Sequence, residues 1–517
     1  MTDTIGRLRA RFPRVRLPGG VFGRSVVTLA SGTAVAQLGL ALATPVLTRL
    51  YSPADYGTLA VYASTVTVLL VIASLRYELA IPLPEDETMA GSLLGLALLL
   101  VAGMTVGLAL LVWLAGDAFI AAVRVPALRP YRWLVPLGFA GAGLYQALSY
   151  WAIRRRAFGR LARTRLSQGL GQVATQLGCG FAGLGAPGLL MGDVVGRVAG
   201  GGGLGLAAVR DRPFARTTRG TLAAAAARYR RFPLLTTWSG LLNVGSLQLP
   251  SILFAAFFGA AAAGLYALSY KMLVLPTMLL GQSVAQVFLS RAAIAARDPA
   301  ELRQLTERTA LVLFGVGLPL FAVVALGGPQ IFGTVMGQRW EQAGRYAQVL
   351  APWFVVWLVS SPLSGLLNVR EWQGSALAFS AGEFVLRLGS LMVGSRAGSP
   401  MLAVALLSAS GVIVSLASIV RFMHAAHSSI LRLVGPAARL LGLTAACLLP
   451  AAAALRAGQA VLTVLAAGLG VTAYYLLALR SEAAARMFRP GAQGSGASEL
   501  TGDALVAAEV ASSGVAS

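Results

Sequence analysis

The chain has 517 residues, of which 57% are hydrophobic and 12% are charged. Its mean hydropathy is +0.74, whereas roughly a quarter of the residues in an ordinary soluble domain are charged. This composition leaves no room for a soluble catalytic domain. The net charge of +23 would suggest nucleic-acid binding in a soluble protein, so its meaning here depends on where the basic residues lie.

Continuous apolar stretches of membrane-spanning length fill most of the chain. A bilayer core about 30 Å thick needs about 20 apolar residues in a helix, so the pattern predicts an all-α integral membrane protein with about 14 transmembrane helices. We place these helices at 25–48, 58–81, 88–115, 131–152, 161–184, 187–209, 233–258, 262–290, 305–327, 344–368, 373–394, 399–423, 430–452 and 457–479.

The basic residues mark one side of the membrane. All but one of the 42 are arginines, and they cluster in alternate loops. The positive-inside rule therefore predicts that both termini are cytoplasmic. We therefore predict a basic cytoplasmic N-terminus at residues 1–24 and a basic cytoplasmic loop at 210–232. The polar residues 481–517 are predicted to form a disordered cytoplasmic tail.

The two sets of six helices show signs of an internal repeat. Ser31-Gly32 in the first set matches Ser239-Gly240 in the second, and Gly57 matches Gly264. Pro136 and Arg154 in the first set match Pro352 and Arg370 in the second, with the same spacing. A duplication of this kind predicts an N-lobe at 25–209 and a C-lobe at 233–423, with a cleft between them. Residues 424–480 then form an additional C-terminal helix pair.

One segment carries a family signature. Residues 48–83 read TRLYSPADYGTLAVYASTVTVLLVIASLRYELAIPL, with Arg49, Pro53, Asp55 and Gly57 in the first turn and Arg76-Tyr77-Glu78 near the end. The segment resembles the polysaccharide biosynthesis proteins of the O-antigen flippase type, which belong to the superfamily of multidrug, oligosaccharidyl-lipid and polysaccharide exporters. The resemblance implies a MATE-like bundle of two six-helix lobes.

The signature turn also has a physical explanation of its own. Pro53 lacks an N–H and restricts Ser52, so one helix ends there. Asp55 can cap the next helix by accepting a backbone N–H. These residues either shape a hairpin or contact the substrate directly.

Several ionisable residues fall at membrane depth, where each must face protein or water. Asp193 with Arg197, and Glu383 with Arg387, are four residues apart on one helix and can neutralise each other. Each pair either holds helices together or supplies a carboxylate that binds a coupling H⁺ or Na⁺. Glu78 is a third candidate for ion coupling, or it pairs with Arg76.

The remaining bases are candidates for contact with an anion. Lys271 has no acid at helical spacing within its span, so we expect it to contact an anionic substrate head or to pair with an acid from another helix, such as Glu383. Arg76 is a second candidate contact, although it can also snorkel. Arg24 is a third, or it only marks topology.

These features predict transport. We find no catalytic motif, no metal-binding motif and no cofactor-binding motif in the sequence. The resemblance implies a flippase in the bacterial cytoplasmic (inner) membrane that moves undecaprenyl-pyrophosphate-linked oligosaccharide for O-antigen, capsule or exopolysaccharide assembly. Its partners would be this substrate, membrane lipids, and the glycan polymerase and export machinery, without nucleic acid. A cation-coupled multidrug exporter and a membrane-embedded glycan polymerase or ligase are the alternatives.

Overall fold

The computed structural model describes residues 21–211, 214, 217–369 and 372–480, and every regular element among them is helical. The predicted tail 481–517, residues 1–20 of the basic N-terminus and Arg370 of the repeat comparison lie outside the described residues.

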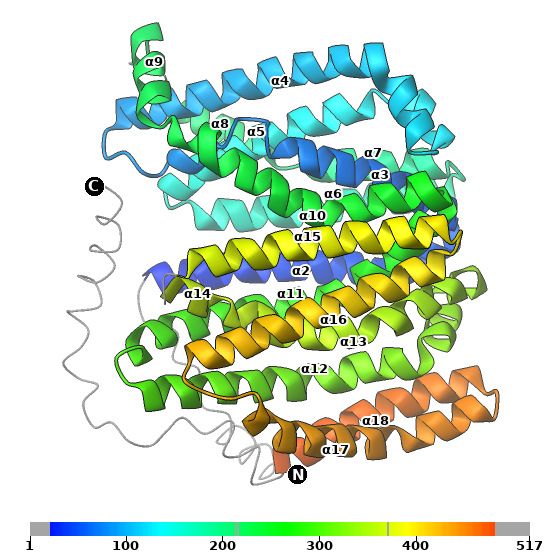
Figure 1. Ribbon diagram of the computed structural model, residues 1–517. Helices are drawn as coiled ribbons and strands as arrows, with labels where there is room; N and C mark the ends of the chain where they lie inside the picture. Colours follow the sequence, from blue (N-terminus) through cyan, green and yellow to red (C-terminus); the bar gives the residue numbers. More distant parts are fainter. Residues whose placement is uncertain (1–20, 212–213, 215–216, 370–371, 481–517) are drawn as a thin grey trace, which may run out of the picture. The chain divides into compact units, whose positions relative to one another are not determined.

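The long helices lie side by side with their axes close to parallel or antiparallel (Figure 1). The N-terminal helices are α2 (Val21–Leu50), α3 (Pro53–Leu70), α4 (Glu87–Ala122), α5 (Leu134–Arg154), α6 (Phe158–Phe181), α7 (Ala186–Val198) and α8 (Gly201–Arg210). The C-terminal helices are α10 (Thr237–Phe258), α11 (Ala260–Ala295), α12 (Pro299–Met336), α13 (Glu341–Leu363), α15 (Gln373–Arg396) and α16 (Pro400–Ala425). The helices α17 (Leu431–Arg456) and α18 (Ala460–Arg480) follow.

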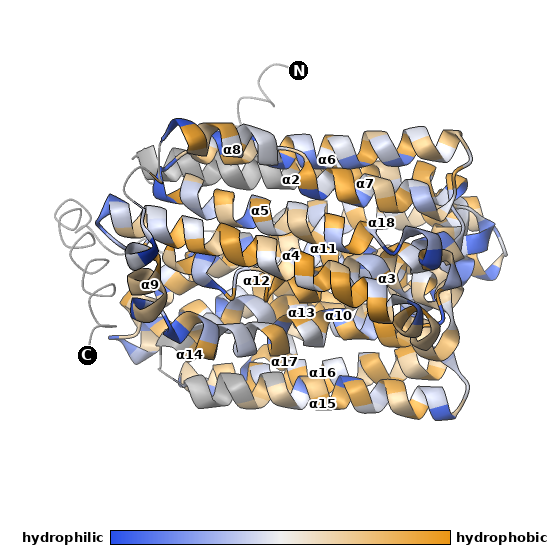
Figure 2. Ribbon diagram, turned by 90° about the horizontal axis from the view of Figure 1, so that it is seen from above, coloured by the Kyte–Doolittle hydropathy of each residue, from blue (hydrophilic) through white to orange (hydrophobic). Residues whose placement is uncertain are grey.

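Shorter elements connect these helices. They are η1 (Tyr77–Ala80), η2 (Pro126–Tyr131), α9 (Arg219–Arg228), η3 (Phe232–Thr236), η4 (Gln338–Trp340) and α14 (Gly365–Val369). Each predicted span therefore coincides with one helix or with a helix and a short neighbour. Figure 2 shows hydrophobic residues along the lengths of the helices and hydrophilic residues gathered at their ends.

Eight helices of the described residues are long and apolar enough to cross a membrane. The other predicted spans are less apolar or shorter. For example, α6 contains Arg160, Arg163 and Arg165 in its first turns, and α7 has 13 residues. Such segments need the protein around them to cover their polar groups, because lipid offers those groups no partners.

Two predicted spans are interrupted. The span 187–209 divides into α7 and α8 because Gly200 has a φ of 84°, a left-handed conformation that glycine adopts without strain. The span 58–81 ends as an α-helix at Leu70 and resumes as η1, after Leu75 and Arg76 take φ values of 51° and 64°. Neither of these two residues is a glycine, so the prediction of one continuous helix there was wrong for a reason that local propensity did not reveal.

The connection at 210–232, expected to be a loop, contains α9. Thr218 and Thr221 form a reciprocal cap at its start, and an alanine run follows, which favours a helix. The helix packs on α4: Ala225 is fully buried, and the hydroxyls of Ser92 and Thr221 lie 3.0 Å apart. This basic segment is thus docked on the N-terminal helices.

The signature turn between α2 and α3 has the predicted capping geometry. The backbone N–H of Ser52 donates to the Asp55 carboxylate at 2.8 Å, and the Asp55 N–H donates to the Ser52 hydroxyl at 3.2 Å. Pro53 occupies the first helical position, where its missing N–H has no cost. The exposed Arg49 lies in the last turn of α2.

The same turn joins the N-terminal helices to the C-terminal ones. The Trp340 indole donates to the Thr48 carbonyl at 2.8 Å and packs edge-on against Tyr56, with ring centroids 4.9 Å apart. A Cβ on Gly57 would lie 1.8 Å from the Ala260 carbonyl oxygen, and one on Gly264 would lie 1.8 Å from the Pro53 carbonyl oxygen. The two glycines matched by the repeat therefore allow backbone contact between α3 and α11.

Candidate functional site

A cavity of about 510 Å³ lies among the N-terminal helices α2, α3, α5, α6 and α7. Its polar lining consists of Gln37 of α2, Tyr145, Gln146, Ser149 and Tyr150 of α5, Arg165, Gln168 and Gln172 of α6, and Asp193 and Arg197 of α7. Buried polar side chains need partners, and those facing a cavity can be satisfied by water or a ligand. The cavity is therefore a polar chamber within an otherwise apolar helix bundle.

The Asp193 carboxylate connects this cavity to Lys271. Asp193 forms a close ion pair with Arg197, one turn further along α7, as the spacing predicted. Lys271 projects from α11, is half-buried, and is near enough to Asp193 for their charges to attract. Among the described residues, Asp193 is the acid of another helix whose charge acts on Lys271, at a distance longer than that of an ion pair.

A second polar network lies where the predicted second span is interrupted. Glu78 is 1% exposed and accepts hydrogen bonds from the Ser74 hydroxyl and, at 2.7 Å, from the Gln146 amide. Arg76 lies 3.8 Å from the same carboxylate. Because Gln146 also lines the cavity, this network forms part of the cavity's wall.

The Arg76 guanidinium reaches across to α10. A Cβ on Gly240 would lie 2.7 Å from its Nη2 atom, so the guanidinium lies close against the α10 backbone. Lys271 and Arg76, the two bases predicted to contact an anion, thus both lie where N-terminal and C-terminal helices meet. Arg24 belongs to α2 by its backbone, and its side chain lies outside what the structure describes.

The second predicted acid–base pair has a different environment. Arg387 is 5% exposed, pairs closely with Glu383, and donates at 3.1 Å to both the carbonyl and the hydroxyl of Ser246. Its guanidinium also stacks 5.3 Å from the centre of the Trp353 ring. The adjoining cavity measures about 10 Å³, so little free space remains beside Arg387, whereas the Glu383 side chain is 28% exposed.

Sequence reasoning missed the cavity residues of α6. Arg165, Gln168 and Gln172 follow one another at intervals of three and four, which places them on one face of a helix. This polar stripe within a predicted span was the signal that could have identified them. Gln146 carried no comparable signal, because its importance comes from contact with Glu78.

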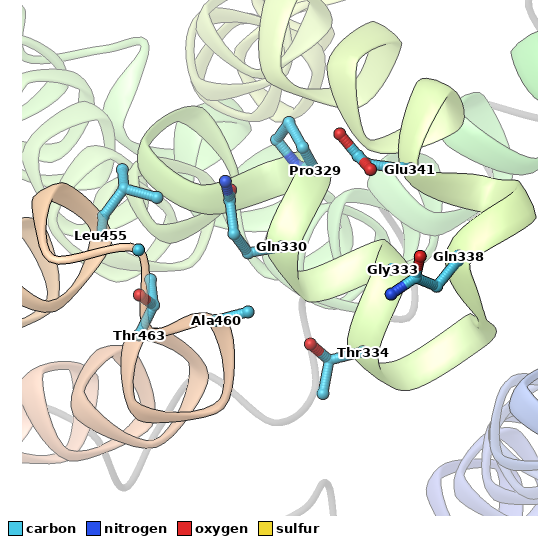
Figure 3. A pocket seen from close by; sticks show the side chains of 10 residues that line it. Pro329, Gln330, Gly333, Thr334, Gln338, Glu341, Leu455, Ala460 and Thr463 are labelled. Atoms are coloured by element: carbon cyan, nitrogen blue, oxygen red, sulfur yellow. The ribbon is translucent and has the colours of Figure 1, made fainter.

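Another cavity, of about 260 Å³, lies among α12, η4, α13, α17 and α18. Figure 3 shows Gln330, Gln338 and Glu341 around it. Glu341 already pairs with Arg345 at 3.0 Å, and both side chains are exposed. Among the residues that the structure describes, no group of three or more His, Cys, Asp or Glu side chains is placed to hold a metal ion.

Residues 46–345 match the family described as polysaccharide biosynthesis protein, which is more than half of the chain. The chain belongs to the polysaccharide biosynthesis protein family. No curated protein matches this family member.

Two solved structures have a fold similar to that of this chain. The family member superposes on the lipid II flippase MurJ, in an inward closed conformation, with a TM-score of 0.65 and 10% identity over 88% of this chain and 99% of that one. It also superposes on a multidrug resistance MATE family transporter in an inward-facing conformation. The TM-score is 0.51, and the identity is 14% over 78% of this chain and 95% of that one. The protein is thus an all-α, multi-pass membrane protein with a MurJ- and MATE-like fold.

Proposed function

We propose that this protein is a flippase that moves undecaprenyl-pyrophosphate-linked oligosaccharide from the inner to the outer leaflet of the bacterial cytoplasmic membrane. The family membership and the fold shared with a lipid II flippase support this proposal. The observation that carries it is the polar cavity among the N-terminal helices, with Lys271 of α11 near enough to Asp193 of its lining for their charges to attract. A charged head that crosses in such a chamber avoids the hydrocarbon, while the polyprenyl tail stays in lipid.

In this proposal, Lys271 and Arg76 contact the pyrophosphate, with Arg24 as a further contact. Phosphate oxygens form strong charge-assisted hydrogen bonds with ammonium and guanidinium groups. Asp193 competes with the pyrophosphate for Lys271. Uptake of H⁺ or Na⁺ by Asp193 would remove that competition and couple the ion to substrate binding, as an intramembrane carboxylate is suited to do.

The other two coupling candidates differ in how available they are. Glu78 already has Ser74, Gln146 and Arg76 as partners, and Glu383 is paired closely with a buried Arg387 and does not line the N-terminal cavity. We therefore assign coupling to Asp193 first. Alternating access between the N-terminal and C-terminal helices then requires the backbone contact at Gly57 and Gly264 to open.

The alternatives have less support. A multidrug exporter shares the fold, but organic cations favour acids along the path, and here the bases Lys271 and Arg165 lie in or beside the cavity. A glycan polymerase or ligase would need catalytic groups, whereas the solved relatives are a flippase and a transporter by name. We propose transport of a glycan made for O-antigen, capsule or exopolysaccharide, with a polymerase and export machinery acting after it.

The Lys271→Ala variant tests this function in cells that make the glycan. We expect loss of most surface glycan and accumulation of lipid-linked precursor on the inner leaflet, and partial retention of export in Lys271→Arg. Arg345→Ala is the control, because Arg345 is an exposed base that pairs with Glu341 away from the cavity. Normal export by Lys271→Ala would contradict the proposed contact.

A further inference from the structure

The lining of the N-terminal cavity suits a ligand rich in hydroxyl groups. Glutamine amides and tyrosine hydroxyls each provide both a donor and an acceptor, which is what a sugar hydroxyl requires of its partner. The cavity contains Gln37, Gln168 and Gln172 in addition to Tyr150, which come from three different helices. Its volume of about 510 Å³ lies within the range of roughly 300–1,000 Å³ that small-molecule sites occupy.

One charge in this lining is uncompensated. Arg197 is neutralised by Asp193, whereas no ion pair of Arg165 is present among the described residues. The Arg165 guanidinium lies 5.3 Å from the centre of the Tyr145 ring, and the Tyr145 hydroxyl is 2.9 Å from the Thr164 hydroxyl. A buried, hydrogen-bonded tyrosine thus holds this guanidinium at the cavity wall, where it can bind a carboxylate with two parallel hydrogen bonds.

The cavity also lies beside the groups that would hold the pyrophosphate. Asp193 lines it and attracts Lys271, and Gln146 lines it and donates to Glu78, the partner of Arg76. Asp193 therefore lies between Lys271 and the cavity, and Glu78 and Gln146 lie between Arg76 and the cavity. A sugar attached directly to a pyrophosphate at these bases would be next to the cavity.

We propose that this cavity binds the sugar portion of the transported glycan, and that Arg165 selects a sugar bearing a carboxylate. The proposal rests on the proposed flippase function and specifies its substrate class, an acidic glycan. Glutamine and tyrosine groups bind the hydroxyls that all sugars share, and Arg165 distinguishes uronic acids from neutral sugars. A neutral sugar offers no carboxylate to the Arg165 guanidinium and cannot form the charge-assisted hydrogen bonds that an acidic sugar forms. This difference in binding separates the two classes of sugar.

Binding of simple sugar probes to the purified full chain in nanodiscs tests this proposal. We expect phenyl β-D-glucuronide to bind roughly tenfold to a hundredfold more tightly than phenyl β-D-glucoside, the ratio expected for one charge-assisted contact. Arg165→Gln should remove that difference and leave glucoside binding unchanged. Gln168→Leu should weaken both sugars alike, because it removes a contact to shared hydroxyls.

The matched control is Arg163→Gln. Arg163 lies two residues away on α6 and is exposed as Arg165 is, but it does not line the cavity. This variant therefore makes the same change in charge and should leave both affinities unchanged. Equal loss in the two arginine variants would mean general electrostatics and overturn the role of Arg165. Failure of both sugars to bind the wild type, or unaltered binding by Gln168→Leu, would overturn the sugar site.

Phenyl phosphate distinguishes an acidic sugar from the pyrophosphate itself. If it binds through Arg165 as tightly as the glucuronide does, Arg165 belongs to the phosphate contact and the selection of a carboxylate is wrong. The flippase proposal fails separately, through normal export by Lys271→Ala. If the wild type binds the sugars but Lys271→Ala exports normally, the sugar site stands and the proposed flippase function is wrong.

Discussion

The two halves of the molecule contain the same local motif in opposite surroundings. Asp193 with Arg197, and Glu383 with Arg387, are both close acid–base pairs one helical turn apart. The first pair lies on a cavity of about 510 Å³, and the second adjoins one of about 10 Å³. The first pair borders a cavity that can admit a ligand or ion, whereas Arg387 is buried against Ser246 and Trp353 with little free space beside it.

The difference comes from what packs around each pair. Trp353 stacks on Arg387 and has Phe354 and Trp357 as neighbours, with ring centroids 5.1 and 6.3 Å away. The corresponding space among the N-terminal helices is lined by glutamines and tyrosines. An acid–base pair is therefore a stabilising element in one half and a candidate part of the transport path in the other.

The largest effect on stability is expected from Arg387→Met. The substitution removes the buried guanidinium that binds Glu383, Ser246 and Trp353. Breaking a buried pair from one side costs about 3–5 kcal/mol, an upper bound here because the Glu383 side chain is 28% exposed. Denaturant unfolding in mixed micelles would measure the loss. Arg396→Met is the control, since Arg396 is an exposed base in the last turn of the same helix. Equal stability of the two variants would mean that the contacts of Arg387 do not stabilise the fold.

A smaller loss of stability is expected from Arg197→Met. We expect the free energy of unfolding to fall by less than about 3 kcal/mol, the usual upper value for a hydrogen bond to a charged group. Asp193 keeps the attraction of Lys271 and faces a cavity that admits water. The same unfolding measurement compares the two pairs directly. A loss of stability as large as that of Arg387→Met would show that the surroundings of the two pairs do not differ in energy.

The smallest of these losses is expected from Gly411→Ala on α16, which tests how tightly the C-terminal half is filled. A Cβ at Gly411 would lie 2.4 Å from the Trp353 indole, and overpacking of this kind costs about 1–3 kcal/mol. Gly389→Ala is the matched control, because nothing lies within 4 Å of its Cβ position and alanine favours the helix. An unchanged stability of Gly411→Ala would mean that the aromatic packing beside Arg387 is loose.

Much of the fold followed from periodicity and composition. The fourteen apolar stretches each coincide with helical structure, and the turn at Ser52 to Asp55 has the predicted cap, because both depend on interactions within a few residues. The pairing of Asp193 with Arg197 and of Glu383 with Arg387 was predictable for the same reason. Local spacing alone brings these groups together.

The interruption after Leu70 and the cavity itself required the tertiary structure. Leu75 and Arg76 take left-handed conformations without a glycine nearby to indicate them, in a segment where Glu78 is held by Ser74 and by Gln146 of another helix. Proximity of Lys271 to Asp193, which lie 78 positions apart (271 − 193), likewise depends on how helices pack. A sequence specifies which side chains a helix face presents, but the volume left between faces depends on all the neighbours at once.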